Sequence, residues 1–166
     1  MEMKEILIDK VVVNMGVGNE PDEMKKSQKI IESVTGKKAL KTKTKLRIPT
    51  WGLRPGLEIG LKITLRGKDA KEFLDRAFAA KEKQLKAKNF DQRGNFGFGI
   101  KEYIDMPGTR YDPKMGIKGF DILVALKRRG YRISKKKIRP SKLGKSHIIT
   151  KEEAIEFVKA MGVEVV

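Results

Sequence analysis

A strict alternation of side-chain types from residue 58 to residue 66 constrains the fold of this 166-residue chain more than any other stretch. Branched apolar residues take every second position, and small, polar or basic residues lie between them: Ile59, Leu61, Ile63 and Leu65 against Gly60, Lys62, Thr64 and Arg66. A period of two places successive side chains on opposite faces of a β-sheet. The sequence therefore predicts a strand with an apolar face against helices and a free cationic face.

The preceding residues, 36–56, predict a first strand and a loop that complete a hairpin. In the strand, Lys41, Lys43 and Lys45 alternate with Leu40, Thr42, Thr44 and Leu46. The loop, Arg47 to Gly56, contains the only tryptophan, Trp51, between Arg47 and Arg54. An aromatic ring beside arginines suits base stacking and phosphate contact. The alternative is a well-solvated basic hairpin with Trp51 tucked over an edge of the core.

The charge of the chain indicates the class of its partner. Lysine and arginine number 38 against 21 aspartates and glutamates, a net charge of +17. Such an excess attracts polyanions. Nucleic acid is favoured over an anionic membrane surface, because Ile122 to Leu126 is among the longest apolar runs and is far too short to span a bilayer. The absence of cysteine excludes disulfides and thiolate metal sites.

The first half of the chain predicts strand, helix, two strands and helix in that order. Ile6 to Met15 is rich in Val and Ile and reads as a strand. A helix is expected to start near Pro21 and to stop at Gly36. After the hairpin, Asp69 and Glu72 form a capping-box pattern that opens a second helix. The apolar face of that helix is expected to run from Phe73 to Leu85.

The second half predicts two more strands and a short final helix. Asn95 to Tyr103 is expected to be a strand, and the nearly all-apolar Phe120 to Lys127 a central strand buried on much of both faces. Thr150 and Glu153 form a second capping box, and Gly162 would end the helix that it opens.

These elements predict an α+β fold. Its antiparallel sheet would carry helices on one face, in the split βαβ topology of ferredoxin-like and RNA-recognition domains, and would leave the other face open for RNA. We expect a single RNA-binding domain over residues 1–137. Residues 138–166 would form a basic linker and a C-terminal helix packed on the same domain.

A run of cations without any acid extends from Lys127 to Lys145 and predicts contact with a nucleic-acid backbone that does not read sequence. Its ten members are Lys127, Arg128, Arg129, Arg132, Lys135, Lys136, Lys137, Arg139, Lys142 and Lys145.

Motifs for catalysis or for cofactors are weak. Gly16-Val17-Gly18 lacks the third glycine of a dinucleotide fingerprint. Ser134 and Lys137 have the spacing of an acylating pair but no companion motifs. His147 is the only histidine and is expected to be a polar residue just before the last helix. The sequence therefore predicts no enzyme, no cofactor and no metal site.

Residues 93–99, Arg-Gly-Asn-Phe-Gly-Phe-Gly, resemble the aromatic-glycine motif of RNA-recognition strands, with the register off by one residue. Phe96 and Phe98 either stack on bases or point inward while the glycines permit close packing. The sequence leaves both orientations open.

Five segments, taken in order, resemble one family. They are Asn14-Met15-Gly16-Val17-Gly18, Thr35-Gly36-Lys37-Lys38, Leu61-Lys62-Ile63-Thr64-Leu65-Arg66-Gly67, residues 93–99, and Gly119-Phe120-Asp121-Ile122. Together they are similar to the L-five family of large-subunit ribosomal proteins, and the ending from His147 to Ala154 is similar to its archaeal and eukaryotic branch.

The resemblance implies a structural protein without catalytic activity, in the cytoplasm and within the ribosome. Its implied partners are 5S rRNA in the central protuberance, 23S-type rRNA, the elbow of the P-site tRNA, neighbouring ribosomal proteins, and a small-subunit head protein reached through an intersubunit bridge. A free-standing RNA chaperone or RNA-modifying factor with the same fold is the alternative.

By position, the family's 5S-contacting residues fall on Asn14, Lys37, Trp51 and Thr64. Bacterial members have glutamine where Lys37 stands and phenylalanine where Trp51 stands; Lys37 cannot accept a hydrogen bond, whereas Trp51 keeps a stacking surface. The loop with Arg47, Trp51 and Arg54 would face tRNA. The other residues expected at RNA are Lys41, Lys43, Lys45, Lys62, Arg66 and Arg93, with the rRNA backbone on Lys127, Arg128, Arg129, Arg132, Lys135, Lys136, Lys137 and Arg139.

Overall fold

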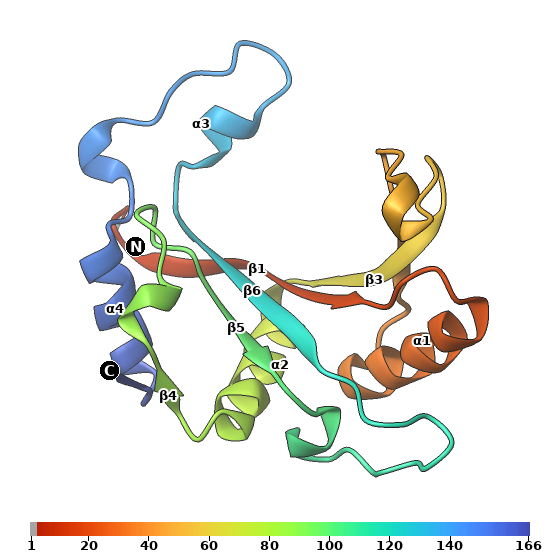
Figure 1. Cartoon of the computed structure of the whole chain (residues 1–166). Coiled ribbons are helices and arrows are strands. Elements are labelled where there is room, and N and C mark those ends of the chain that lie inside the picture. The colour runs from red at the N-terminus through yellow and green to blue at the C-terminus, as the bar shows by residue number, and fades with distance from the viewer. Residues whose placement is uncertain (1–2) are drawn as a thin grey trace.

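The computed structural model describes residues 3–166, so the first two residues of the predicted domain lie outside the described part. Its centre is a five-stranded sheet in the order β2-β3-β1-β6-β5, in which all neighbours are antiparallel (Figure 1). The strands are β1 (Ile6–Gly16), β2 (Leu40–Lys43), β3 (Glu58–Leu65), β5 (Phe96–Ile100) and β6 (Phe120–Arg128). The predicted α+β class with an antiparallel sheet is confirmed.

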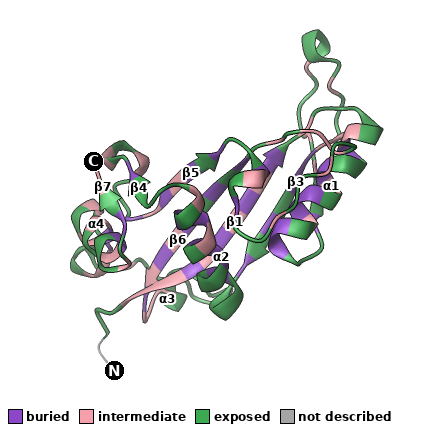
Figure 2. Ribbon diagram, turned by 90° about the horizontal axis from the view of Figure 1, so that it is seen from below, coloured by how far each residue is buried: buried purple, intermediate pink, exposed green. Residues whose placement is uncertain are grey.

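Two helices, α1 (Pro21–Thr35) and α2 (Gly67–Ala80), cover one face of this sheet, α1 on β3 and α2 on β1 (Figures 1 and 2). Ile30 and Ile31 of α1 and Leu74 of α2 are fully buried in this layer. The two helices leave the opposite face uncovered, and we call it the open face.

The alternation predicted for residues 58–66 is confirmed in β3. Leu61 and Ile63 are buried under the helices, whereas Lys62 and Thr64 are exposed. The expectation that β6 is buried on both faces is wrong, because its residues alternate in burial and Leu123 is 52% exposed. An apolar run does not reveal whether its second face will be covered.

Helix α1 has the predicted boundaries. Pro21 occupies its first position, and Gly36 ends it in the left-handed region at φ 66°, where its N–H donates to the carbonyl of Glu32. A residue with a Cβ is strained at that φ, which explains a glycine there.

Helix α2 departs from the prediction at both ends. It starts at Gly67, before the expected cap Asp69, and the Asp69 carboxylate instead pairs with Lys37 at 2.8 Å. The helix ends at Ala80, so Leu85 is buried from the short strand β4 (Gln84–Leu85) instead of the helix.

The aromatic residues of β5 point into the core. Phe96 and Phe98 are 3% and 6% exposed, and their rings lie 6.3 and 5.7 Å from the ring of Phe78. Base stacking by these two residues is therefore excluded. The intervening Gly97 packs closely on β6, since a Cβ there would lie 2.7 Å from the side chain of Leu123.

The C-terminal helix α4 (Lys151–Ala160) begins with the predicted capping box. The Thr150 hydroxyl accepts from the Glu153 N–H, and the Glu153 carboxylate accepts from the Thr150 N–H at 3.0 Å. The same carboxylate accepts from Arg128 at 2.7 Å, which ties α4 to the end of β6. After α4, β7 (Glu164–Val165) pairs in parallel with β4.

Short elements complete the described residues. They are η1 (Pro49–Trp51), η2 (Ala87–Asn89), η3 (Tyr103–Asp105), α3 (Arg132–Lys135) and η4 (Lys145–His147). Among residues 3–166, no helix has the length and apolar character needed to cross a membrane.

The two faces of β3 generate a stability prediction. Leu61 is fully buried, so Leu61→Lys places an unpaired ammonium group in the core and should lower the free energy of unfolding by about 3 kcal/mol or more. The neighbouring Lys62→Glu is the control and should stay within about 0.5 kcal/mol of the parent. Thermal melts followed by circular dichroism measure both; equal melting temperatures for the two variants would contradict the assignment of faces.

The Arg128–Glu153 contact generates a pH prediction. The backbone N–H of Thr150 and the guanidinium of Arg128 hold the pKa of Glu153 below its ordinary value of 4.5. Such a carboxylate stabilises the fold above pH 4.5, and this stability is lost as the pH falls through the lowered pKa. Because its side chain is 38% exposed, we expect Glu153→Gln to cost only about 1 kcal/mol at pH 7.

The loss should disappear near pH 3, where the parent carboxyl is also neutral. Glu152→Gln is the matched control, since Glu152 lies in the same first turn without an ion pair among the described residues. Urea unfolding at pH 7 and pH 3 compares the three proteins. A Glu153→Gln defect that is as large at pH 3 as at pH 7 would contradict the electrostatic cause.

Candidate nucleic-acid interface

The open face is built from the outward residues of three adjacent strands. Asn14 in β1 lies directly opposite Lys62 in β3 on one side and Asp121 in β6 on the other. Directly opposed residues of antiparallel strands share a face. The same rule places Val12 beside Thr64. The predicted contacts Asn14, Lys62 and Thr64 therefore lie next to one another on the open face.

A shallow groove of about 820 Å³ crosses the open face between β1 and β5. Its floor is apolar and includes Val12 and the exposed Leu123. Its polar lining contains more amides and carboxylates than cations: Asn14, Asn89, Asn95, Asp91 and Asp121 with Lys10 and Lys62. Amides, carboxylates and an apolar floor suit base edges and base faces better than phosphates.

The lysines of β2 are arranged differently from the prediction. Lys41 lies opposite the buried Leu61 and therefore on the helix side, where it pairs with Glu58 at 2.7 Å. Leu40, expected on the apolar face, lies opposite Lys62 on the open face and is 69% exposed. The register shifts again before Lys43, which lies opposite Glu58. The predicted placement of Lys41 among the open-face lysines is wrong, because β2 is a short edge strand with this irregularity.

The loop between β2 and β3 rises from one end of the open face (Figure 1). A bridge between Ile48 and Leu53 closes it, and Gly52 ends η1 at φ 65°. Trp51 at its tip is 70% exposed, so it does not cover an edge of the core. Lys45, Arg47 and Arg54 are also exposed in this loop.

Lys37 and Arg93 lie at opposite margins. Lys37 follows α1 and lines a second pocket with Lys62, Thr64 and Arg66, which brings it to the β3 side of the open face. Its ion pair with Asp69 raises the pKa of the Lys37 ammonium, which keeps this group charged. Arg93 is exposed in the turn before β5, next to groove residues Asp91 and Asn95.

The basic segment, residues 129–145, follows β6 and rises from the other end of the open face, with α3 within it (Figure 1). Four of the predicted backbone-binding residues are exposed and have no ion pair among residues 3–166: Arg132, Lys136, Lys137 and Arg139. Lys127 and Lys135 both pair with Asp9, and Arg129 pairs with Glu5.

Arg128 has a structural position instead of the expected surface one. It is 4% exposed and held by Glu153 and by the carbonyl of His147 at 3.4 Å. An arginine so enclosed cannot reach a phosphate, so we leave it out of the interface.

The base of the basic segment is closed by hydrogen bonds around Tyr131. Its hydroxyl donates to the carbonyl of His147 at 3.2 Å and accepts from the N–H of Ile149 at 3.0 Å. The His147 ring is bonded through Nε2 to the carbonyl of Arg129 at 2.7 Å. His147 thus helps to hold the two ends of the segment together.

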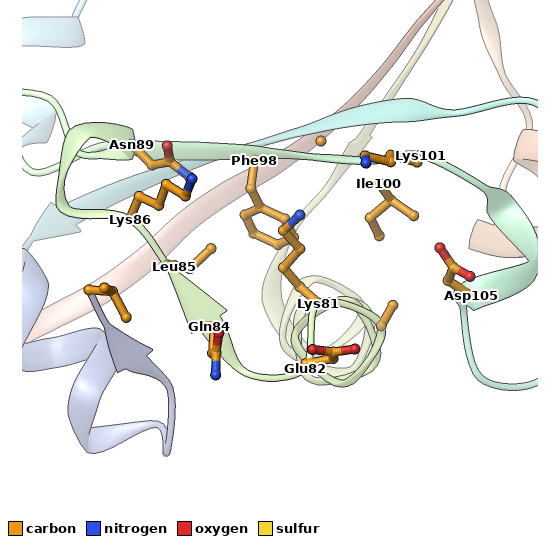
Figure 3. A pocket seen from close by; sticks show the side chains of 13 residues that line it. Lys81, Glu82, Gln84, Leu85, Lys86, Asn89, Phe98, Ile100, Lys101 and Asp105 are labelled. Carbon is orange, nitrogen blue, oxygen red and sulfur yellow. The ribbon is translucent and has the colours of Figure 1, made fainter.

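A separate pocket of about 500 Å³ lies between α2, β4 and β5 (Figure 3). Leu85, Phe98 and Ile100 line it together with Lys81, Lys86 and Lys101. It contains no histidine, serine or threonine to act as base or nucleophile. Among residues 3–166, no group of three acidic or histidine side chains could hold a metal ion.

Sequence reasoning missed two features of this interface. One is the amide lining from Asn89 and Asn95, which lies near β5 only after the chain folds. The other is Asp9, whose carboxylate meets Arg66, Lys127 and Lys135. A single acid within the Val- and Ile-rich stretch 6–15 was the available signal for it.

Comparisons with known proteins agree with this architecture. The model described as ribosomal protein L5 matches residues 2–54, and the model of the C-terminus of the same ribosomal family matches residues 58–157. A large ribosomal subunit protein uL5 of Methanococcus maripaludis (strain C7) is 48% identical over 161 residues, 95% of this chain and 89% of that protein. Proteins of the same name are 42% identical in Nanoarchaeum equitans and 43% identical in Archaeoglobus fulgidus, over 99% and 97% of this chain and 98% and 90% of their own lengths. Because the matched regions span almost the whole chain, it belongs to the ribosomal protein L5 family.

Proposed function

We propose that this chain is a structural protein of the large ribosomal subunit that binds 5S rRNA with the open face of its sheet. Family membership and relatives named as large-subunit proteins support a structural, non-enzymatic role in the ribosome. The observation that carries the RNA-binding part is the uncovered face itself, where Asn14, Lys62 and Thr64 adjoin on a sheet whose other side is covered by helices.

The chemistry of the groove supports contact with unpaired nucleotides. Leu123 and Val12 provide an apolar floor on which a base or ribose can rest, and Asn14 can both donate to and accept from a base edge. Single-stranded loops of RNA present such unstacked bases, whereas a double helix hides them. A loop of 5S rRNA is therefore the partner that we assign to the groove.

The two raised basic elements extend the interface beyond the sheet. Trp51 between Arg47 and Arg54 offers a stacking surface flanked by cations, and we assign this loop to the elbow of the P-site tRNA and to adjoining 5S rRNA. The exposed cations of the basic segment suit the backbone of 23S-type rRNA. Contacts with neighbouring central-protuberance proteins and with a small-subunit head protein belong to the same proposal.

Two binding experiments test the proposal as a whole. In gel shifts at fixed salt, the protein should bind an archaeal 5S rRNA transcript more tightly than an unrelated hairpin RNA of equal length. Added to archaeal large subunits lacking it, the protein should remain bound through a high-salt sucrose gradient. Equal affinity for both RNAs together with release at high salt would contradict the proposal and favour an RNA chaperone.

The basic segment generates a prediction about salt dependence. Replacing Lys136 and Lys137 by alanine removes two exposed cations, so the log–log slope of affinity against salt should flatten by roughly 0.7–0.9 for each lost phosphate contact. All RNAs should be weakened alike, since phosphate contacts carry no sequence information. The control replaces Lys29 and Lys71, two exposed cations on the helix side, and should leave the slope near that of the parent. Selective loss of 5S rRNA at an unchanged slope would contradict this role.

Trp51 generates a fluorescence prediction. As the only tryptophan and 70% exposed, it should emit as a solvated indole in the isolated protein, and stacking on a base should quench it when RNA is added. Trp51→Ala should weaken binding by roughly 1–3 kcal/mol, and Trp51→Phe, which keeps a stacking ring, should lose less. Separate titrations with 5S rRNA and with tRNA identify the ligand of the loop. Emission that neither RNA changes would remove Trp51 from the interface.

A further inference from the structure

Asp9 occupies an irregularity in β1. The pairing of β1 with β6 shifts between Ile8 and Lys10, which leaves Asp9 as an extra residue. With simple alternation back from Val11 and Val13, its side chain would point into the core. A bulge redirects a side chain, and the contacts of Asp9 with Arg66 and Lys127 place its carboxylate on the open face. The irregularity thus replaces a core-facing acid by one that faces cations.

Three cations from three different elements meet this carboxylate. Lys127 Nζ at the end of β6 lies 3.1 Å from Oδ1, and Lys135 Nζ in α3 lies 2.8 Å from Oδ2. Arg66, just after β3, lies 3.6 Å from Oδ1. The Asp9 side chain is 9% exposed, whereas those of Arg66 and Lys135 are both 60% exposed. Burial acts to raise the pKa of Asp9, but the ammonium groups of Lys135 and Lys127 lower it overall.

The cluster has the charge and the accessibility of an anion site. One carboxylate and three cations leave a local excess of two positive charges, and the exposed cationic groups can still reach a ligand. Without the carboxylate, three like charges a few ångströms apart would repel one another and separate. Asp9 also joins the basic segment to the sheet, because Lys135 belongs to the segment and Lys127 to β6.

We propose that Arg66, Lys127 and Lys135 bind one backbone phosphate of the RNA and that Asp9 is the positioning residue that assembles them. This site rests on the RNA-binding function proposed above and adds to it an acid that favours binding. A simple charge argument predicts the opposite sign, since removing an acid from an RNA-binding surface should strengthen binding. The sign of the effect therefore decides between the two.

The test measures filter binding of an archaeal 5S rRNA transcript over a range of salt concentrations. Asp9→Asn should weaken binding about 3- to 10-fold, and its salt slope should fall by roughly 0.7–0.9, one phosphate contact. Asp75→Asn is the matched control: it makes the same change of charge at an exposed position of α2 with no ion pair among the described residues. It should bind as tightly as the parent or slightly more tightly.

Two further measurements separate positioning from a general loss of folding. In a double-mutant cycle, Asp9→Asn should have little additional effect once Lys135→Met is present, because both changes disrupt the same site. Without RNA, trypsin should cleave at Lys135, Lys136 and Lys137 faster in Asp9→Asn than in Asp75→Asn, because the segment has lost its tie to the sheet.

The outcomes distinguish this proposal from the function on which it rests. If the parent binds 5S rRNA and Asp9→Asn binds equally or more tightly, the positioning role is overturned and the proposed function stands. Fully additive effects of Asp9→Asn and Lys135→Met overturn it as well. A parent that does not bind 5S rRNA overturns the proposed function and the phosphate site with it.

Discussion

Burial of only one face of the sheet is the constraint on which the rest of the structure depends. Helices α1 and α2 enclose residues such as Val11, Val13 and Leu61, which are fully buried. The opposite face must then be made of side chains that tolerate water, and β1 and β3 place Asn14, Lys62 and Thr64 there. The exposed Leu123 is the exception. Covering such a side chain with a base or ribose would remove apolar surface from water, which favours binding at this face.

The few acids near the interface determine which cations remain available. Glu153 holds Arg128 inside the fold, Asp69 holds Lys37 at the margin of the sheet, and Asp9 gathers three cations at the foot of the basic segment. Cations such as Lys136 and Lys137 lie beyond the reach of these acids. The large positive charge is therefore divided between groups that shape the surface and groups that can meet phosphate.

The predictions that held depend on neighbouring residues, and those that failed depend on distant ones. The faces of β3, the boundaries of α1 and the Thr150 capping box follow from spacings of two to four residues. Lys41 was placed on the wrong face because the register of β2 is set by its pairing with β3. Asp69 was assigned to a cap because the competing partner, Lys37, comes from before the hairpin.

The sequence by itself determined the α+β class, the two-sided character of β3, the excess of positive charge and the resemblance to a ribosomal family. Only the tertiary structure decided that Phe96 and Phe98 point inward, that Arg128 is buried and that Asp9 faces cations. The physical reason is range. Periodicity and capping act within one element, whereas Lys135 reaches Asp9 across 126 positions of the chain, a contact that exists only when β1, β6 and α3 are brought together.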